Sequence, residues 1–271
     1  MEMKFKKFAT QIRIGVVEEM RARGFGHIGG SLSVCDVLAV LYEGVMRYKP
    51  EDPKWPDRDK LVCSKGHAGP AVYATLALKG FFPYDMLASL NQPGTNLPSH
   101  CDRNKTPGID MTTGSLGLGI SAACGMALAG KIANKDYRVY TIVGDGESQE
   151  GQVWEASMFA NHYKLDNLCV IIDWNGLQID GKIVDVMNPT PYDKKLEAFG
   201  YNVVTIDAHD FESIEAGFKA ARECKGKPTA LIAVSLKGKG VSFMENQASW
   251  HGAAPNDEQY EQAVAEIRAT L

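Results

Sequence analysis

Residues 137–146 read YRVYTIVGDG and residues 167–177 read NLCVIIDWNGL, and these two apolar runs decide the fold of the 271-residue chain. Both are rich in β-branched and aromatic residues, which favour strands. Each run ends in glycine and polar residues, the first at Gly144-Asp145-Gly146 and the second at Asp173-Trp174-Asn175-Gly176-Leu177. A helical pattern over 152–163 separates them, so we expect a strand–helix–strand crossover that makes the two strands parallel neighbours.

The alternation of strands and helices continues before and after these two runs. Further strands are predicted at Lys60–Cys63, Val203–Asp207 and Thr229–Val234, and helices at 5–23, 34–47, Pro70–Lys79, 115–133, Phe211–Cys224 and 257–270. The glycine-rich stretch Gly24–Ser33 and the proline-rich stretch Lys49–Asp59 read as irregular segments. We therefore expect an α/β fold with a three-layer, doubly wound, mostly parallel sheet, in one domain spanning residues 1–271. Ligands of such sheets bind beyond the C-terminal ends of the strands.

Composition excludes several classes of protein. The chain has 29 Lys and Arg against 33 Asp and Glu, a net charge of −4 that argues against nucleic-acid binding. Its six cysteines contain no CxxC pair, so neither a disulfide scaffold nor a thiolate zinc site is expected. Residues 1–20 lack the apolar core of a signal peptide, and no apolar run approaches the ~20 residues that cross a bilayer. We expect a cytoplasmic protein that binds neither membrane nor nucleic acid.

A carboxylate and a carboxamide follow the two central strands. Asp145 and Asn175 lie 30 residues apart, about the length of one crossover, so adjacent parallel strands bring them to the same edge of the sheet. Their oxygens are hard ligands that suit Mg²⁺ or Ca²⁺ rather than zinc. Flanking glycines leave room for phosphate oxygens, and the helix that starts near Glu150 offers its positive end to an anion.

This arrangement resembles the cofactor motif of thiamine diphosphate enzymes, and further motifs are similar to those of the transketolase family in the family's order. They are GHIGG at 26–30, DKLVCSKGHA at 59–68, KTPG at 105–108, TGSLG at 113–117, KGKGV at 237–241 and WHG at 250–252. The resemblance covers about residues 5–265 and implies a thiamine diphosphate-binding fold, the diphosphate-binding (PP) domain.

The resemblance also implies a cofactor site. It implies thiamine diphosphate with Mg²⁺, which Ca²⁺ or Mn²⁺ can replace, and makes the side chains of Asp145 and Asn175 and the carbonyl of Leu177 the metal ligands. The implied contacts of the cofactor are His67, Gly114, Ser115, Leu116, Gly146, Asn175 and His251. The family often has proline where this chain has Ser115.

Four of the six histidines follow breaks in the predicted elements: His27, His67, His100 and His251. Neutral imidazoles donate and accept hydrogen bonds and move protons near physiological pH, which suits a polyhydroxylated sugar substrate. The matching transketolase positions line the substrate channel, so the resemblance implies that these four act in catalysis. His162 and His209 are assigned to structure or solvent.

For five charged residues near the motifs, both a functional role and a simpler alternative are open. Glu150 and Glu155 follow the metal motif, and the resemblance places them at a subunit interface near the cofactor pyrimidine, whereas favourable charge near a helix N-terminus is the simpler alternative. Lys65, Lys237 and Lys239 are candidates for neutralising phosphate, although we expect each of them to be solvated.

The family's activating glutamate lies on a second domain for which these 271 residues leave no room. We therefore expect the N-terminal subunit of a split transketolase, active only with a partner subunit that carries the pyrimidine-binding and C-terminal domains, as an α2β2 heterotetramer. The expected reaction transfers a two-carbon ketol unit from a ketose phosphate to an aldose or aldose phosphate. Two alternatives stay open: the alpha subunit of a 2-oxo acid dehydrogenase, and a non-catalytic cofactor-binding regulator.

Overall fold

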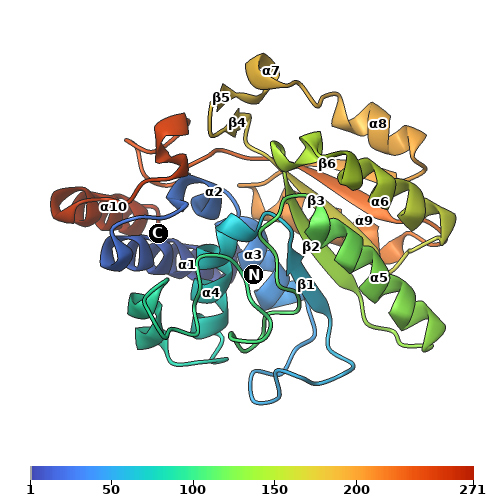
Figure 1. The fold of residues 1–271 in the computed structure, drawn as a ribbon, viewed down its shortest axis with the longest axis horizontal. Coiled ribbons are helices and arrows are strands. Elements are labelled where there is room, and N and C mark those ends of the chain that lie inside the picture. Colours follow the sequence, from blue (N-terminus) through green and yellow to red (C-terminus); the bar gives the residue numbers. More distant parts are fainter. Residues whose placement is uncertain (1) are drawn as a thin grey trace.

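Five parallel strands form the central sheet of the computed structural model, which describes residues 2–271 (Figure 1). Their order is β1 (Lys60–Cys63), β2 (Val139–Gly144), β3 (Leu168–Trp174), β7 (Thr229–Val234) and β6 (Asn202–Asp207). The predicted neighbours β2 and β3 pair in parallel, with Gly144 opposite Asp173. Met1, which begins the N-terminal stretch considered above, lies outside the described residues.

The strands bury both faces of the sheet because successive side chains point to opposite sides. On β2, Tyr140 and Ile142 enter one core while Val139 and Val143 enter the other. The first core is covered by α1 (Glu2–Arg23), α3 (Cys35–Val40), α4 (Gly69–Leu78), α9 (Phe211–Glu223) and α10 (Asp257–Ala269). The second is covered by α5 (Leu118–Ile132), α6 (Gly151–His162) and α8 (Tyr192–Ala198). The two cores make the three predicted layers, with α5 and α6 on the opposite side of the sheet from α1, α3 and α4 (Figure 1).

The winding direction reverses between the two ends of the sheet. The connection from β1 to β2 first forms α4 on the face of the first core and then returns to the sheet through α5 on the other face. The connection from β2 to β3 also uses that second face, through α6, whereas β6 connects back to β7 over the first face through α9. Both directions keep the crossovers right-handed. The prediction of a doubly wound parallel sheet is therefore confirmed.

The glycine-rich stretch predicted as irregular contains a short buried helix, α2 (Ile28–Leu32). Gly29 permits close packing there, because a Cβ at this position would lie 3.0 Å from the carbonyl oxygen of Trp250. The helix predicted at 34–47 continues from α3 into a π-helical turn, η1 (Leu41–Val45). The stretch 24–33 was predicted to be irregular, and that prediction was wrong for its centre, where α2 forms.

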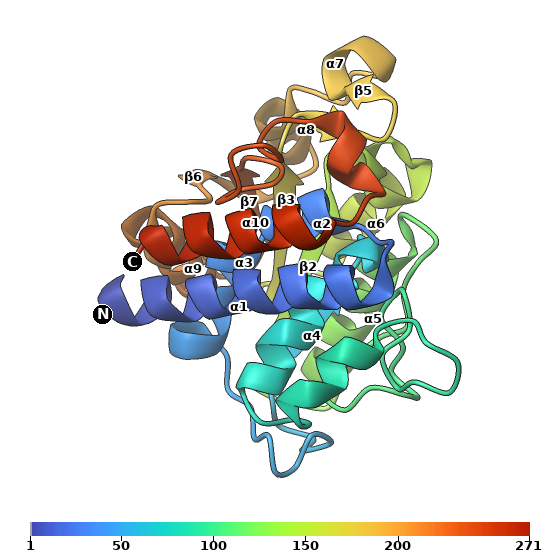
Figure 2. The ribbon, with the colours of Figure 1, turned by 90° about the vertical axis from the view of Figure 1, so that its left-hand side faces the viewer.

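The remaining elements are short. They are η2 (Gly66–Ala68), η3 (Tyr84–Ser89), η4 (Glu147–Gln149), β4 (Leu177–Gln178), β5 (Gly181–Lys182), α7 (Ile183–Val186) and η5 (Ala248–His251), with β4 and β5 forming an antiparallel pair. The first and last helices, α1 and α10, lie side by side (Figure 2). None of the helices formed by residues 2–271 combines the length and apolar character that a membrane crossing requires.

Candidate active site

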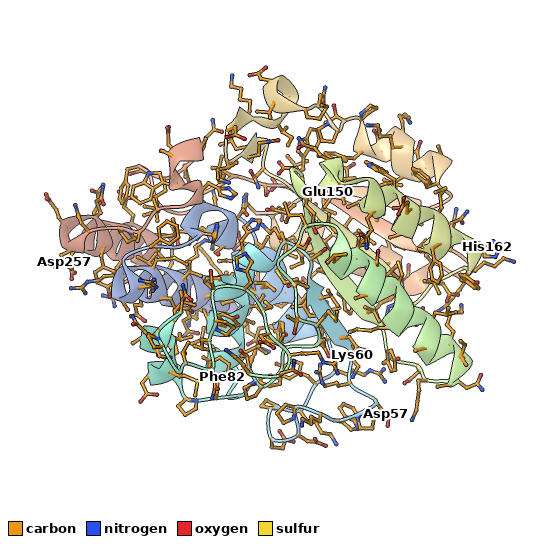
Figure 3. All side chains as sticks on the ribbon, viewed as in Figure 1. Asp57, Lys60, Phe82, Glu150, His162 and Asp257 are labelled. Carbon is orange, nitrogen blue, oxygen red and sulfur yellow. The ribbon has the colours of Figure 1, made fainter. Side chains whose placement is uncertain are left out.

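A cavity of about 330 Å³ lies at the C-terminal edge of the sheet. The segments that leave β1, β2, β3 and β7 all contribute to its lining, as the strand-end rule predicts. The predicted site residues that line it are His27, His67, His100, Gly114, Leu116, Asp145, Gly146, Glu150, Asn175, Leu177 and His251. Figure 3 shows Glu150 at this end of the molecule, above the sheet. One cavity thus joins residues that are up to 224 positions apart in the sequence.

The four loop histidines converge in this cavity. The ring centre of His27 lies 5.2 Å from that of His67, 5.7 Å from that of His100 and 5.4 Å from that of His251. The rings of His67 and His251 are 5.2 Å apart. The convergence expected from the sequence is therefore present.

The surroundings of the four imidazoles keep them neutral. Burial lowers the pKa of His27 and of His100. Burial and the charge of the nearby Lys65 ammonium together lower the pKa of His67 well below its usual value. Burial and the adjacent Lys237 lower the pKa of His251 to about 3. Lys237 Nζ lies 3.0 Å from Nδ1 of His251, and because a charged ammonium can only donate, we assign the ring proton of His251 to Nε2.

The metal ligands expected from the strand ends lie together after β2 and β3. The carboxylate of Asp145 accepts hydrogen bonds from the backbone N–H of Gly146 (2.8 Å) and of Gly176 (2.7 Å). The side-chain oxygen of Asn175 accepts from the N–H of Leu177 at 3.1 Å in the same turn. Gly176 has φ of +78°, a left-handed conformation that favours glycine and lets this turn close around Asp145.

Asp145 is buried without a counterion. It is 3% exposed and forms no salt bridge with any of residues 2–271. Burial and the neighbouring carboxylate of Asp173 raise its pKa to about 6. A divalent cation would compensate this charge, and a carboxylate, an amide oxygen and a backbone carbonyl are the donors that Mg²⁺ prefers. The residues present therefore fit a magnesium ion.

Two of the lysines expected to be solvated are buried, so that prediction was wrong for Lys65 and Lys237. Lys65 is 1% exposed and donates to Asp173 Oδ2 (2.5 Å) and to the carbonyl of Gly30 (2.7 Å). Lys237 is 2% exposed and has no carboxylate partner within residues 2–271. Burial and the charge of Lys65 lower the pKa of Lys237 to about 8. A buried cation without a counterion, in a cavity lined by glycine backbone, fits the diphosphate of a cofactor.

Sequence reasoning missed Glu147, a buried carboxylate in η4 that connects three segments of the cavity wall. It accepts hydrogen bonds from the hydroxyl of Ser64 (2.5 Å), the N–H of Gly117 (2.9 Å) and the N–H of Gly144 (3.0 Å). Burial raises its pKa, although these three donors oppose the shift. Its position one residue after Gly144-Asp145-Gly146 was the only available signal.

Some predicted residues lie outside the lining. Ser115 is exposed between Gly114 and Leu116, which both line the cavity, and Glu155 is exposed on α6. Glu150 lines the cavity mouth while remaining exposed. His162 is exposed at the end of α6, as expected.

His209 has a structural role, as expected. Its Nε2 accepts from the N–H of Leu236 at 2.9 Å, so the proton is on Nδ1, which faces Asp36 Oδ2 at 2.8 Å. Asp36 also pairs with Arg13 in the core. These bonds fasten the segment after β7 to α1 and α3.

Comparisons with known proteins identify the family of the chain. Residues 5–269 match the family described as "Transketolase, thiamine diphosphate binding domain". The chain is 50% identical to the 6-deoxy-6-sulfo-D-fructose transketolase subunit SqwG of Clostridium sp. (strain MSTE9), over 96% of this chain and 94% of that protein. It is 44% identical to an apulose-4-phosphate transketolase subunit of Phocaeicola vulgatus, over 89% of this chain and 86% of the relative.

A solved structure of a transketolase has the same fold as this chain. The transketolase from Leishmania mexicana superimposes with a TM-score of 0.93 and 32% sequence identity, over 97% of this chain and 41% of the other. This chain thus spans about two-fifths of the Leishmania mexicana transketolase chain but nearly the whole of the two subunits. From the family match and these similarities, the chain belongs to the transketolase family and contains its thiamine diphosphate binding domain.

Proposed function

We propose that this chain is the diphosphate-binding subunit of a two-chain transketolase. With its partner it transfers a two-carbon ketol unit from a ketose phosphate to an aldose or aldose phosphate. The observation that carries the proposal is the single cavity in which four neutral imidazoles, the buried cation Lys237 and the uncompensated carboxylate Asp145 meet. The two similar proteins named as transketolase subunits have nearly the same span, and the family match favours this function over a 2-oxo acid dehydrogenase alpha subunit.

The cofactor site contains groups of both charges. We assign the side chains of Asp145 and Asn175 and the carbonyl of Leu177 to Mg²⁺, which Ca²⁺ or Mn²⁺ can replace. His67, Gly114, Ser115, Leu116, Gly146, Asn175 and His251 would contact thiamine diphosphate. When bound, the cofactor supplies a nucleophilic carbon that can attack a ketose carbonyl. Lys237, buried and without an acidic partner, would compensate diphosphate charge.

The histidines would orient the sugar and move its protons. Because their pKa values are lowered, His27, His67, His100 and His251 are neutral at physiological pH and can each donate and accept one hydrogen bond. Lys237 holds the proton of His251 on Nε2, which leaves that N–H free to donate to a hydroxyl or a developing oxyanion. His27 contacts the other three rings and is therefore placed centrally for proton transfer.

The partner would complete the cofactor site. Glu150 lies at the exposed mouth of the cavity, directly before α6, where a second chain can reach it, and Glu155 is exposed on α6. We assign both to the interface with a partner that carries the pyrimidine-binding and C-terminal domains. We propose an α2β2 assembly in the cytoplasm, with residues 1–271 acting as one cofactor-binding domain.

Reconstitution tests this function. The chain is purified alone and together with the transketolase-like subunit that co-purifies with it, and each preparation is offered a ketose phosphate with an aldose acceptor, or pyruvate. We expect ketol transfer only by the assembled complex, no turnover of pyruvate, and no activity in the Asp145→Ala complex. Ketol transfer by the chain alone would contradict the split site, and unchanged activity of Asp145→Ala would indicate a regulatory subunit instead.

A further inference from the structure

A second cavity, of about 970 Å³, lies at the opposite edge of the sheet from the active site. It is lined by part of the proline-rich stretch 49–59, by Lys60 at the start of β1, and by the loop 103–110 that contains the KTPG motif. It shares no lining residue with the active-site cavity. In Figure 3, Lys60 lies in the lower half of the molecule and Glu150 in the upper half. Strand β1 alone separates Lys60 from the active-site segment after Cys63 by ~13 Å.

The lining of this cavity is strongly basic although the chain as a whole is acidic. Five cations line it: Lys54, Arg58, Lys60, Arg103 and Lys105. Only two carboxylates accompany them. One of these, Asp110, is already engaged, because it pairs with Arg58 at 2.6 Å and accepts the N–H of Leu61 at 2.9 Å. The cavity therefore has an excess of positive charge in a chain whose net charge is −4.

Lys60 is a half-buried ammonium without a counterion among the described residues. Its Nζ lies 5.4 Å from the ring centre of Tyr137, a weak substitute for a carboxylate. Burial and the charge of Arg58 lower its pKa. The nearby acids are engaged elsewhere, since Asp57 pairs with Lys135 at 2.7 Å and Asp59 accepts the backbone N–H of Arg47 and of Arg138 at 2.8 Å. An anion beside Lys60 would supply the missing partner.

The loop over this cavity is ordered by its own hydrogen bonds. The side chain of Asp102 accepts the N–H of Asn104 at 2.9 Å, and its carbonyl accepts the N–H of Thr106 at 3.0 Å. Arg103 and Lys105, on either side of Asn104, are exposed, and their side chains form no salt bridge within residues 2–271. The bonds thus fix the backbone while both charged side chains stay available to a ligand.

We propose that this basic cavity binds a small organic anion that carries two or more phosphate or sulfate groups. Arginine and lysine together match tetrahedral oxyanions, the guanidinium through paired hydrogen bonds and the ammonium as a point charge. The volume is within the range of small-molecule sites, and four cations without a carboxylate partner suit more than one dianionic group. The segment that carries Arg103 and Lys105 continues to Gly114 and Leu116, so the anion would contact a segment that also lines the active site.

Calorimetric titration tests the site with fructose 1,6-bisphosphate as the probe. The chain is first saturated with thiamine diphosphate and Mg²⁺, and the titration is run at physiological ionic strength. We expect one probe molecule to bind per chain, and we expect Arg103→Gln/Lys105→Gln to weaken binding at least tenfold. The matched control Lys7→Gln/Lys227→Gln removes the same charge from positions outside the cavity and should change affinity less than twofold.

Three results would overturn the proposal. The first is the absence of binding to the wild-type chain, and the second is equal weakening by the cavity and control variants, which would indicate unspecific attraction. The third is loss of binding in His27→Ala with full binding in Arg103→Gln/Lys105→Gln, which would place the probe in the active site. Because no turnover is measured, failure here leaves the proposed function untouched.

Discussion

Replacing Lys65 by methionine would leave the carboxylate of Asp173 buried without its cation. The two groups are 2.5 Å apart, and each side chain is 2% exposed. Removing one partner of such a pair costs about 3–5 kcal/mol, because the remaining charge has neither water nor a counterion. Three donors stay on Asp173, from Ser33 (2.8 Å), Ser235 (2.5 Å) and Asn175 (3.2 Å).

Because these three donors remain, we expect Lys65→Met to lower the free energy of unfolding by an amount near the lower end of this range. That is about 3 kcal/mol, or roughly a 150-fold decrease in the folding equilibrium constant. Urea denaturation of the chain, followed by circular dichroism, measures this free energy of unfolding. The second variant, Lys65→Met/Asp173→Asn, also removes the isolated charge and should recover at least about 1 kcal/mol.

Lys194→Met is the matched control, because Lys194 pairs with Glu197 at 3.0 Å but its side chain is 69% exposed. Exposed pairs contribute about 0–1 kcal/mol, so this variant should remain close to wild type. A loss below about 1 kcal/mol in Lys65→Met, or no recovery in the double variant, would refute the assignment of Lys65 and Asp173 as a structural ion pair.

Two buried carboxylates and one close-packed glycine give three further predictions. Asp36 is buried, but Arg13 and His209 outweigh the effect of burial and lower its pKa from 3.8 to about 2. Its stabilisation is therefore complete above about pH 5 and is lost progressively as the pH falls towards about 1, and acid titration of stability should show this loss in wild type but not in Asp36→Asn. Burial raises the pKa of Glu19, whose two oxygens have no partner among the described residues. Glu19→Met should therefore raise the free energy of unfolding at pH 7 by about 1–3 kcal/mol, and the increase should be smaller near pH 4, where the carboxyl group is more often protonated in both states. Gly119→Ala would place a Cβ 2.5 Å from Cα of Ser64 and should destabilise the chain in thermal denaturation, whereas Gly125→Ala on the same helix meets nothing within 4 Å and should stabilise it by about 0.5–1 kcal/mol.

The positions of Asp145 and Asn175 could be predicted because they depend on local rules. A β-rich run followed by glycine marks a strand end, and one crossover between two such runs makes the strands parallel neighbours. The register of Gly144 opposite Asp173 places the two turns side by side. The histidine cluster does not follow from local rules, because His27 and His251 are distant in the sequence and only the family resemblance predicts that they share a site.

Burial of the charged groups could not be predicted, because it depends on contacts between distant segments. Lys65 lies in a glycine-containing turn that reads as exposed, and its partner Asp173 is 108 residues away at the end of a strand. Gly29 likewise reads as a breaker, but it permits close packing of α2 against Trp250, more than 200 residues later. Local sequence therefore predicted the strand ends, and the tertiary structure decided which charges they bury.

Cofactor binding measured by calorimetry, with and without Mg²⁺, examines the proposed joint role of Asp145 and Asn175. We expect wild-type chain to bind thiamine diphosphate tightly only when Mg²⁺ is present, and Asn175→Ala to lose affinity at least roughly tenfold for the cofactor with the metal. His27→Ala, the control from the same cavity, should keep nearly wild-type affinity because the role proposed for His27 is proton transfer and not cofactor binding. Binding that is independent of Mg²⁺, or an equal loss of cofactor affinity in both variants, would contradict a divalent ion held between these two strand ends.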